Sequence, residues 1–164
     1  MMKNFGSPLK IGVISDTHGF LRPEVFDVFS SVDHILHAGD VCSDDVLAEL
    51  SRLAPVSAVR GNSDFTPKCR KLPLFDVVKI GRAEIFLHHG HVDAFDGMPA
   101  GVNIIVSGHT HLPRVELFGG ILRVNPGSAG PRRPSVPVSV AVITIYNRAR
   151  SAEIIELPEP CEQP

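Results

Sequence analysis

The sequence predicts an α/β fold in which two mixed β-sheets pack face to face as a single domain, with helices on their outer faces. Three observations lead to this prediction. Short apolar runs alternate with amphipathic helical segments in the first part of the chain, and closely spaced strand-like runs follow with few helices between them. No linker or repeat divides the 164 residues, a length that buries a sizeable core as one unit.

The first β-α unit begins at residues 9–14, LKIGVI, an apolar run typical of a short buried strand. The run ends in the polar residues 15–18 and in Gly19, which permits a tight turn. Pro23 then suits the first turn of a helix, and apolar side chains recur after it at helical spacing, at Val25, Phe26 and Phe29. The polar residues therefore follow the carboxyl end of a strand, where we expect chemistry.

Two further strands end in the same way. Residues 34–37 (HILH) lead into Gly39-Asp40, and residues 56–60 (VSAVR) lead into the polar run 61–64. Between these strands, Ser43 can cap a helix that has acidic residues in its first turn and apolar residues on one face. A polar turn thus follows each of three strands, which we expect to be parallel.

The rest of the chain is predicted to form a sheet rich in hairpins, with turns at Gly81 and at Gly119-Gly120. Its strands are expected at residues 77–80, 84–87, 104–106, 115–118, 121–124, 138–145 and 152–155. This sheet would pack against the parallel strands. The domain is expected to span residues 1–157, followed by a disordered tail at residues 158–164.

The composition excludes several classes of function. A formal net charge of -2 provides no broad basic field for nucleic acid or an anionic membrane. The absence of Trp and the single Tyr argue against stacking platforms, so no sequence-specific nucleic-acid binding is expected. No apolar stretch approaches the roughly 20 residues of a membrane span. Three cysteines without a C-x-x-C pair fit a reducing compartment, so we expect a cytoplasmic protein, for which a homodimer through exposed sheet edges is compatible with the sequence.

Histidine is the unusual part of the composition. Five of the eight histidines fall into two clusters, each directly after an apolar strand. The first cluster is LHHGHV, with His88, His89 and His91, and the second is SGHTHLP, with His109 and His111. Histidines two positions apart on a continuing strand share a face, which suits two nitrogen ligands aimed at one centre.

Asp16, His18, Asp40 and Asn62 also follow predicted strands, and with these imidazoles they provide enough ligands for two metal ions that retain open positions. The charges of two divalent ions, two carboxylates and a bridging hydroxide sum to about plus one, and a centre with this charge would attract an anionic phosphate ester. The hydroxide would attack phosphorus in line with the leaving oxygen. Each residue taken singly is as well explained as a turn-forming strand terminator. Their number and order favour the metal site.

The order of these motifs resembles the calcineurin-like metallophosphoesterases. Five ordered motifs carry the resemblance: D-x-H from Asp16, G-D at Asp40, G-N-x-D at 61–64, H-G at His89 and G-H-x-H at 108–111. Arg60, the HGH element, GHTHLP and the NPGS run at 125–128 narrow it to the small YfcE-like branch, which also includes the retromer scaffold subunit. The resemblance implies a four-layer α/β/β/α sandwich, in agreement with the elements above.

For the site, the resemblance implies one ion held by Asp16, His18 and His111, a second held by Asn62, His89 and His109, and Asp40 bridging the two. It implies Mn²⁺ as the activator, although Fe²⁺, Zn²⁺ and Ni²⁺ also suit these nitrogen and oxygen ligands. His88 is the alternative to His89 as a ligand, and the H-G alignment favours His89. His34 and His37 are expected to be core or rim histidines, and Asp44 a helix first-turn charge.

The chain departs from the superfamily pattern at Ser63, because many members have a histidine there that protonates the leaving group. A serine hydroxyl is a poor general acid, so activated leaving groups such as phenolates are expected to be favoured. His91 is the candidate substitute, against the alternative that it only supports a ligand or faces solvent. The expected catalytic residues are therefore Asp40, Asn62 and His91.

Two functions fit the sequence. The first is a metal-dependent phosphoesterase, specifically a phosphodiesterase, acting on a small phosphate ester. The second is a non-catalytic protein-binding scaffold of the retromer-subunit type, in which the metal site is vestigial. The full ligand set favours the enzyme, because a scaffold has no reason to retain all seven residues.

Overall fold

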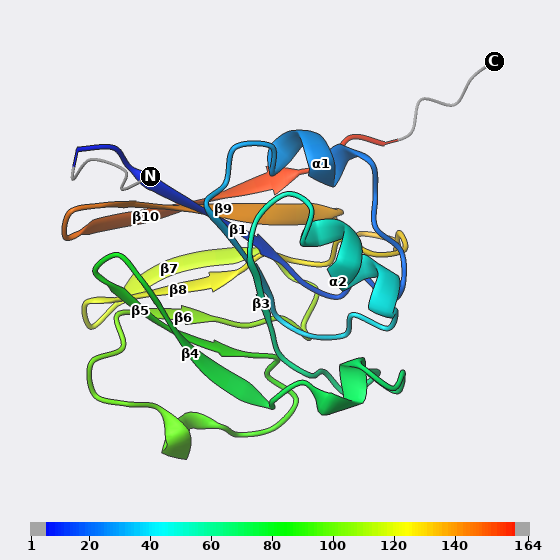
Figure 1. Cartoon of the computed structure of the whole chain (residues 1–164), viewed down its shortest axis with the longest axis horizontal. Helices are drawn as coiled ribbons and strands as arrows, with labels where there is room; N and C mark the ends of the chain where they lie inside the picture. The colour runs from blue at the N-terminus through cyan, green and yellow to red at the C-terminus, as the bar shows by residue number, and fades with distance from the viewer. Residues whose placement is uncertain (1–5, 160–164) are drawn as a thin grey trace.

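The computed structural model describes residues 6–159, which form two five-stranded β-sheets packed face to face (Figure 1). Each sheet contains both parallel and antiparallel neighbours. The prediction of two mixed sheets in a single domain is confirmed. Among residues 6–159, no helix has the length and apolar composition needed to cross a bilayer.

The first sheet is centred on parallel strands joined by helices. These elements are β1 (Leu9–Ile14), α1 (Glu24–Val28), β2 (His34–His37), α2 (Asp44–Leu50) and β3 (Val56–Ala58). A hairpin of β9 (Ser139–Tyr146) and β10 (Ala149–Glu156) pairs antiparallel with β1, so the order is β10-β9-β1-β2-β3. The predicted cap of α2 is present, since the Ser43 hydroxyl accepts a hydrogen bond from the Asp45 N–H at 3.3 Å.

The second sheet has the order β4-β5-β6-β8-β7. Its strands are β4 (Phe75–Ile80), β5 (Ala83–His88), β6 (Ile104–Val106), β7 (Arg114–Phe118) and β8 (Ile121–Asn125). Strands β5, β6 and β8 are parallel, and the hairpins β4–β5 and β7–β8 turn at the predicted glycines. A short 3₁₀ turn, η1 (Cys69–Lys71), lies on the connection from β3 to β4.

Alternation along the strands divides the core into layers. Side chains such as Val13 and Leu87 fill the space between the two sheets. The opposite face of the first sheet, with Ile14 and Ile35, packs against α1 and α2 together with Phe29. Period-two alternation therefore gives each strand of the first sheet one face toward the second sheet and one toward the helices.

The outer layer of the second sheet is thinner than that of the first. Phe86 and Ile105 pack there against Ala94 and Val102 from the segment 90–103, whose regular element is the 3₁₀ turn η2 (Phe95–Gly97). Glycines and a proline in this segment disfavour a longer helix. The fourth layer of the sandwich is thus a loop with one helical turn.

The division of strands between the sheets differs from the expectation in one respect. The β9–β10 hairpin was expected in the second, hairpin-rich sheet, but it joins the first sheet beside β1. Its antiparallel pairing covers the side of β1 that β2 leaves open, which would otherwise be an exposed edge. Of the expected tail, residues 158–159 have no regular structure, and residues 160–164 lie outside the described residues.

Candidate metal centre

The predicted site residues lie on loops that follow β1, β2, β3, β5 and β6, and hydrogen bonds join these loops. The Asp16 N–H donates to the Gly39 carbonyl, and the Gly108 N–H donates to the His89 carbonyl, both at 3.0 Å. Between the two sheets, the His109 N–H donates to Oδ2 of Asp16 at 3.1 Å. The loops of both sheets therefore meet at one edge of the sandwich.

The backbone is strained at many of the predicted ligands. Residues with positive φ include Asp16 (55°), His18 (48°), Asp40 (52°), His109 (69°) and His111 (63°). This left-handed region is uncommon outside glycine, and each such residue costs on the order of 1–3 kcal/mol. Backbone strain at several residues of one site is typical of a functional site, because the surrounding fold must hold these residues in an unfavourable conformation.

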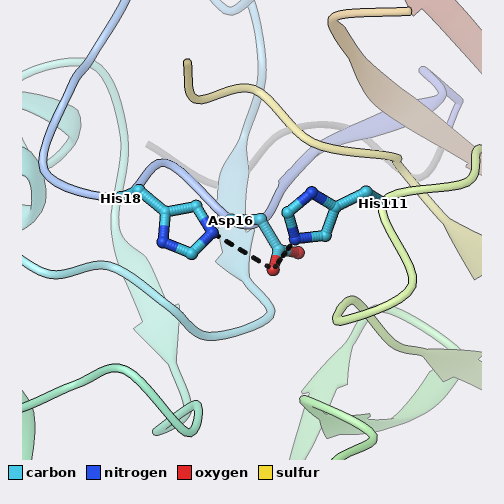
Figure 2. Close-up of side chains that lie close together, drawn as sticks. All are labelled: Asp16, His18 and His111. Atoms are coloured by element: carbon cyan, nitrogen blue, oxygen red, sulfur yellow. Dashed lines mark ion pairs between the residues drawn. The ribbon is translucent and has the colours of Figure 1, made fainter. Parts of the chain in front are cut away.

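Asp16 lies between two imidazole rings, as Figure 2 shows. Nε2 of His111 is 3.1 Å from Oδ1 of Asp16, and Nε2 of His18 is 3.9 Å from the same oxygen. The Asp16 side chain is fully buried, whereas 23% of the His18 side chain is exposed. The ligand atoms of the three residues lie within 4.8 Å of one another, a spacing that can hold one metal ion.

A second cluster of this kind contains Asp16, Asp40 and His89. Nε2 of His89 is 3.5 Å from Oδ2 of Asp40 and 3.1 Å from Oδ1 of the exposed Asn62. Nδ1 of His89 lies 2.7 Å from the Ala38 carbonyl, so this nitrogen carries the hydrogen in the neutral ring and Nε2 offers a lone pair. Either a proton on Nε2 of His89, which then donates to these oxygen atoms, or a metal ion joins the converging groups.

Asp40 belongs to the second cluster and also faces His18 of the first. Its Oδ2 is 3.8 Å from Nε2 of His18 and 3.5 Å from Nε2 of His89, so one oxygen faces an imidazole of each cluster. Its Oδ1 accepts a hydrogen bond from the Ser63 N–H at 2.8 Å. Burial raises the pKa of this carboxyl, but the hydrogen bonds from His89 and Ser63 outweigh burial and hold the pKa below its usual range. The carboxylate is therefore ionised at neutral pH.

His109 and His91 border the second cluster. The His109 ring centroid is 5.1 Å from that of His89, and the His91 centroid is 5.3 Å from His89 and 6.3 Å from His109. The structure thus brings all the predicted site residues around one centre. His88 is not among them, because its ring packs against Phe86 and Phe95 on the outer face of the second sheet.

Some of the buried polar atoms that lack a hydrogen-bond partner belong to the proposed ligands. Within residues 6–159, Oδ1 of Asp16 and Nε2 of His18 are buried and lack such a partner. A buried unpaired group costs about 1–3 kcal/mol, and more when it is charged. One divalent cation would satisfy both atoms, and a nitrogen and oxygen set without thiolate suits first-row divalent metals. The residues present therefore fit a metal centre.

Comparison with known proteins identifies the family. The model of the calcineurin-like phosphoesterase superfamily domain matches residues 9–148, which include every residue of both clusters. The chain belongs to this superfamily. It is therefore a hydrolase that acts on phosphate esters, as the motif order predicts.

Relatives from distant organisms match most of the chain. A probable metallophosphoesterase of Methanothermobacter thermautotrophicus is 38% identical in an alignment that covers 92% of this chain and 94% of that protein. Phosphodiesterase YfcE of Escherichia coli K12 is 29% identical over 82% of this chain and 87% of that protein. Wild-type Vps29 of Entamoeba histolytica, solved in complex with zinc, has a TM-score of 0.67 and 26% identity, covering 90% of this chain and 99% of Vps29.

The residues that orient the ligands were not identified from the sequence. The Ser15 hydroxyl donates to Oδ2 of Asp16 at 2.6 Å, and the Ala38 carbonyl fixes His89. The contact between Ser15 and Asp16 could have been predicted from the sequence, because a serine directly precedes the first motif aspartate at the end of a buried strand. A backbone carbonyl gives no sequence signal.

Glycine at position 61 allows the loops after β2 and β3 to touch. A Cβ there would collide with Oδ1 and the backbone nitrogen of Asp40. Asp64 fastens the same loops, because its carboxylate accepts hydrogen bonds from the Gly61 N–H at 2.7 Å and the Cys42 N–H at 2.8 Å. The G-N-x-D motif therefore supplies one ligand and the contacts that position Asp40.

The NPGS run and His37 have structural roles beside the ligands. Nδ2 of Asn125 donates to the Gly108 carbonyl at 2.9 Å, and the Ser128 hydroxyl donates to the Asp16 carbonyl at 3.1 Å, so the NPGS run supports the ligand loops. His37 is fully buried, accepts a hydrogen bond from the Gly39 N–H at 3.2 Å, and lies 3.1 Å from the Thr17 hydroxyl. Burial, helped by the nearby His89, lowers the pKa of His37 to about 3, as suits a neutral core histidine.

Replacing Ser15 by alanine is expected to weaken metal binding about 10- to 100-fold, because Asp16 loses the shorter of the two hydrogen bonds that orient its carboxylate. Titration of the metal-free variant with Mn²⁺ measures this effect. The matched control is Ser151→Ala, which changes an exposed serine on β10 and should bind Mn²⁺ as the unaltered protein does. Equal affinity in Ser15→Ala and Ser151→Ala would contradict the assigned role of Ser15.

Proposed function

We propose that this protein is a phosphodiesterase that hydrolyses small phosphate diesters at a dinuclear centre, with Mn²⁺ as the metal. The observation that carries the proposal is the pair of overlapping clusters, Asp16–His18–His111 and Asp16–Asp40–His89, at the ordered motifs of the superfamily. A centre with one cluster would support a single ion. Two clusters, with Asp40 facing an imidazole of each, support two ions.

In this proposal the ligands divide between two ions. Asp16, His18 and His111 hold the first ion, Asn62, His89 and His109 hold the second, and Asp40 bridges them. When bound, the two ions supply an activated water and neutralise charge on the phosphate. Asp16 forms the buried floor of the site, whereas Asn62 and His109 are exposed, so the substrate approaches from their side.

The leaving-group side of the site is assigned to Asn62 and His91. Nδ2 of Asn62 lies 3.4 Å from the Ser63 hydroxyl and is able to donate to a phosphate oxygen, while Oδ1 faces the second ion. Ser63 itself is a poor acid. The His91 ring lies beside His89 and His109, next to the second cluster. We assign His91 as the proton donor to the leaving oxygen.

Replacing His91 by glutamine is expected to slow hydrolysis of a diester with an alkoxide leaving group by about 10²- to 10⁴-fold, the usual contribution of a general acid. Hydrolysis of bis-p-nitrophenyl phosphate should change far less, because p-nitrophenolate leaves without a proton. Steady-state kcat for the two substrates checks this selectivity. An equal loss on both substrates would show that His91 supports the metal centre and does not donate a proton.

The alternative function is a non-catalytic scaffold, which the similarity to Vps29 brings forward. The two functions make different demands on the ligands. A scaffold does not need open coordination positions, whereas this centre has exposed Asn62 and His109 on one side and two buried, ionisable carboxylates on the other. That arrangement favours catalysis.

Hydrolysis of bis-p-nitrophenyl phosphate, before and after chelation and with Mn²⁺ added back, tests the proposed function. We expect turnover that disappears on chelation, returns with Mn²⁺, and is lost in His109→Ala. Parallel assays with Zn²⁺, Fe²⁺ and Ni²⁺ rank the metals, and p-nitrophenyl phosphate compares diester with monoester. Absence of metal-dependent turnover on both substrates would favour the scaffold.

A further inference from the structure

Strand β7 is an outer edge of the second sheet. Among residues 6–159 its strand partner is β8 alone, so its other side presents backbone N–H and C=O groups without a paired strand. Such an edge is a template for pairing with another chain. β7 also begins shortly after the proposed ligand His111, so whatever covers it lies close to the metal loop.

β7 contains no proline, glycine or lysine, although Pro113 directly precedes it and Arg114 and Glu116 are charged. Apolar side chains on and just before it are strongly exposed, at 58% for Leu112, 69% for Leu117 and 64% for Phe118. By contrast, the edge strand β4 carries Lys79, whose side chain is 73% exposed. The edge strand β10 exposes Glu153. Among the edge strands, β7 therefore exposes the most large apolar side chains.

We propose that β7 pairs antiparallel with β7 of a second copy of this chain, with Val115 opposite its own copy. The partner is a second copy because Arg114 and Glu116 are opposite in charge. In an antiparallel pair of β7 strands, Arg114 of one copy can lie opposite Glu116 of the other. An isologous contact of this kind closes after two copies and leaves no further edge of the same type. The inference rests on the fold and is independent of the proposed function.

Symmetry limits the possible registers. A two-fold axis between antiparallel copies of one strand maps each face of the sheet onto itself, so one residue must lie opposite its own copy. With Arg114 or Glu116 on the axis, two like charges lie opposite each other. With Leu117 on the axis, Glu116 lies opposite Phe118. With Val115 on the axis, Arg114 of each copy lies opposite Glu116 of the other, so the interface contains two pairs of opposite charge.

Charges on the neighbouring strand favour the same register. Glu116 lies opposite Arg123 of β8, and Nη2 of Arg114 is 3.0 Å from Oε2 of Glu116. In the proposed dimer each Glu116 lies between Arg123 of its own chain and Arg114 of the second copy, so charges alternate across the interface. On each side of these charges, Pro113 lies opposite Leu117 of the second copy, and the exposed Leu112 lies opposite its exposed Phe118.

Light scattering on a dilution series of the full chain tests the dimer. We expect a mass near twice the 17.7 kDa of one chain. Glu116→Arg should give monomers, because the new arginine faces Arg114 of the second copy, and the double variant Arg114→Glu/Glu116→Arg should restore dimers. Glu153→Arg on β10 is the matched control and should remain dimeric. A monomeric unaltered chain, or a dimeric Glu116→Arg, overturns the proposal.

Cysteine cross-linking tests the register. Val115→Cys and Glu116→Cys are each made in a Cys161→Ser background, then oxidised mildly and examined on a denaturing gel. Only Val115→Cys should form a covalent dimer, because Val115 alone lies opposite its own copy. Cross-linking of Glu116→Cys, of both variants equally, or of neither contradicts the proposed pairing. The two experiments do not depend on activity, so failure of the dimer and failure of the proposed function are distinguishable.

Discussion

Asp40→Asn is expected to reduce metal-dependent phosphodiester hydrolysis about 1000-fold or more. Asp40 faces His18 of one cluster and His89 of the other, so its loss removes the ligand shared by both proposed ions. Metal ions contribute several kcal/mol of transition-state stabilisation, and each 1.36 kcal/mol is worth about tenfold in rate. Initial rates with bis-p-nitrophenyl phosphate and saturating Mn²⁺ measure the effect.

Asparagine is the informative replacement because it keeps the shape of Asp40, and its Oδ1 can still accept the hydrogen bond from the Ser63 N–H. Near-ultraviolet circular dichroism should therefore show a folded protein. Asp45→Ala removes a carboxylate from the exposed first turn of α2 and should retain full activity. Activity of Asp40→Asn within a few-fold of Asp45→Ala would rule out a bridging role for Asp40.

Adding Mn²⁺ to the metal-free protein is expected to raise its Tm by roughly 5–10 °C. A ligand present at 100 times its Kd stabilises the native state by about 2.7 kcal/mol, and 1 kcal/mol shifts the Tm of a domain of this size by about 2–4 °C. The physical source is the convergence of the buried Asp16 and Asp40 carboxylates without a compensating cation. Differential scanning calorimetry with and without Mn²⁺ measures the shift.

Asp40→Asn supplies the control for this stabilisation. The increment in Tm should be much smaller in this variant, while the Tm of its metal-free form should be somewhat below that of the unaltered protein, because the ionised Asp40 carboxylate, whose pKa is held low by its hydrogen bonds, stabilises the native state. The same rise in both proteins would mean that Mn²⁺ acts elsewhere. No rise in the unaltered protein would mean that the clusters do not bind it.

The parts of the fold governed by local patterns were predictable. The alternation of apolar strands with polar turns and amphipathic helices located β1, α1, β2, α2 and β3, and glycines located both hairpin turns of the second sheet. Membership of the β9–β10 hairpin in the first sheet was not predictable in this way. That choice depends on which strand edges remain open after the other strands have paired, a property of the whole fold.

The ligands of the candidate site were also predictable from local patterns, whereas the backbone contacts that orient them were not. Asp16, Asp40, His89 and His111 were identifiable because carboxylates and imidazoles after apolar strands are rare and ordered, and the structure brings them together. The contacts that orient them were not, because the Ala38 carbonyl has no side-chain signature and the positive φ of Asp16 and Asp40 is a tertiary property. Sequence patterns indicate which groups are available, and packing determines how they are held.

The central claim is that two metal ions, shared through Asp40, activate this protein for phosphodiester hydrolysis. It is tested most directly by titrating the metal-free chain with Mn²⁺ and measuring bound metal and bis-p-nitrophenyl phosphate hydrolysis in the same samples. We predict that binding saturates at two ions per chain and that activity reaches its maximum only as the second ion binds. Full activity with no bound metal, or with one ion per chain, would contradict the claim.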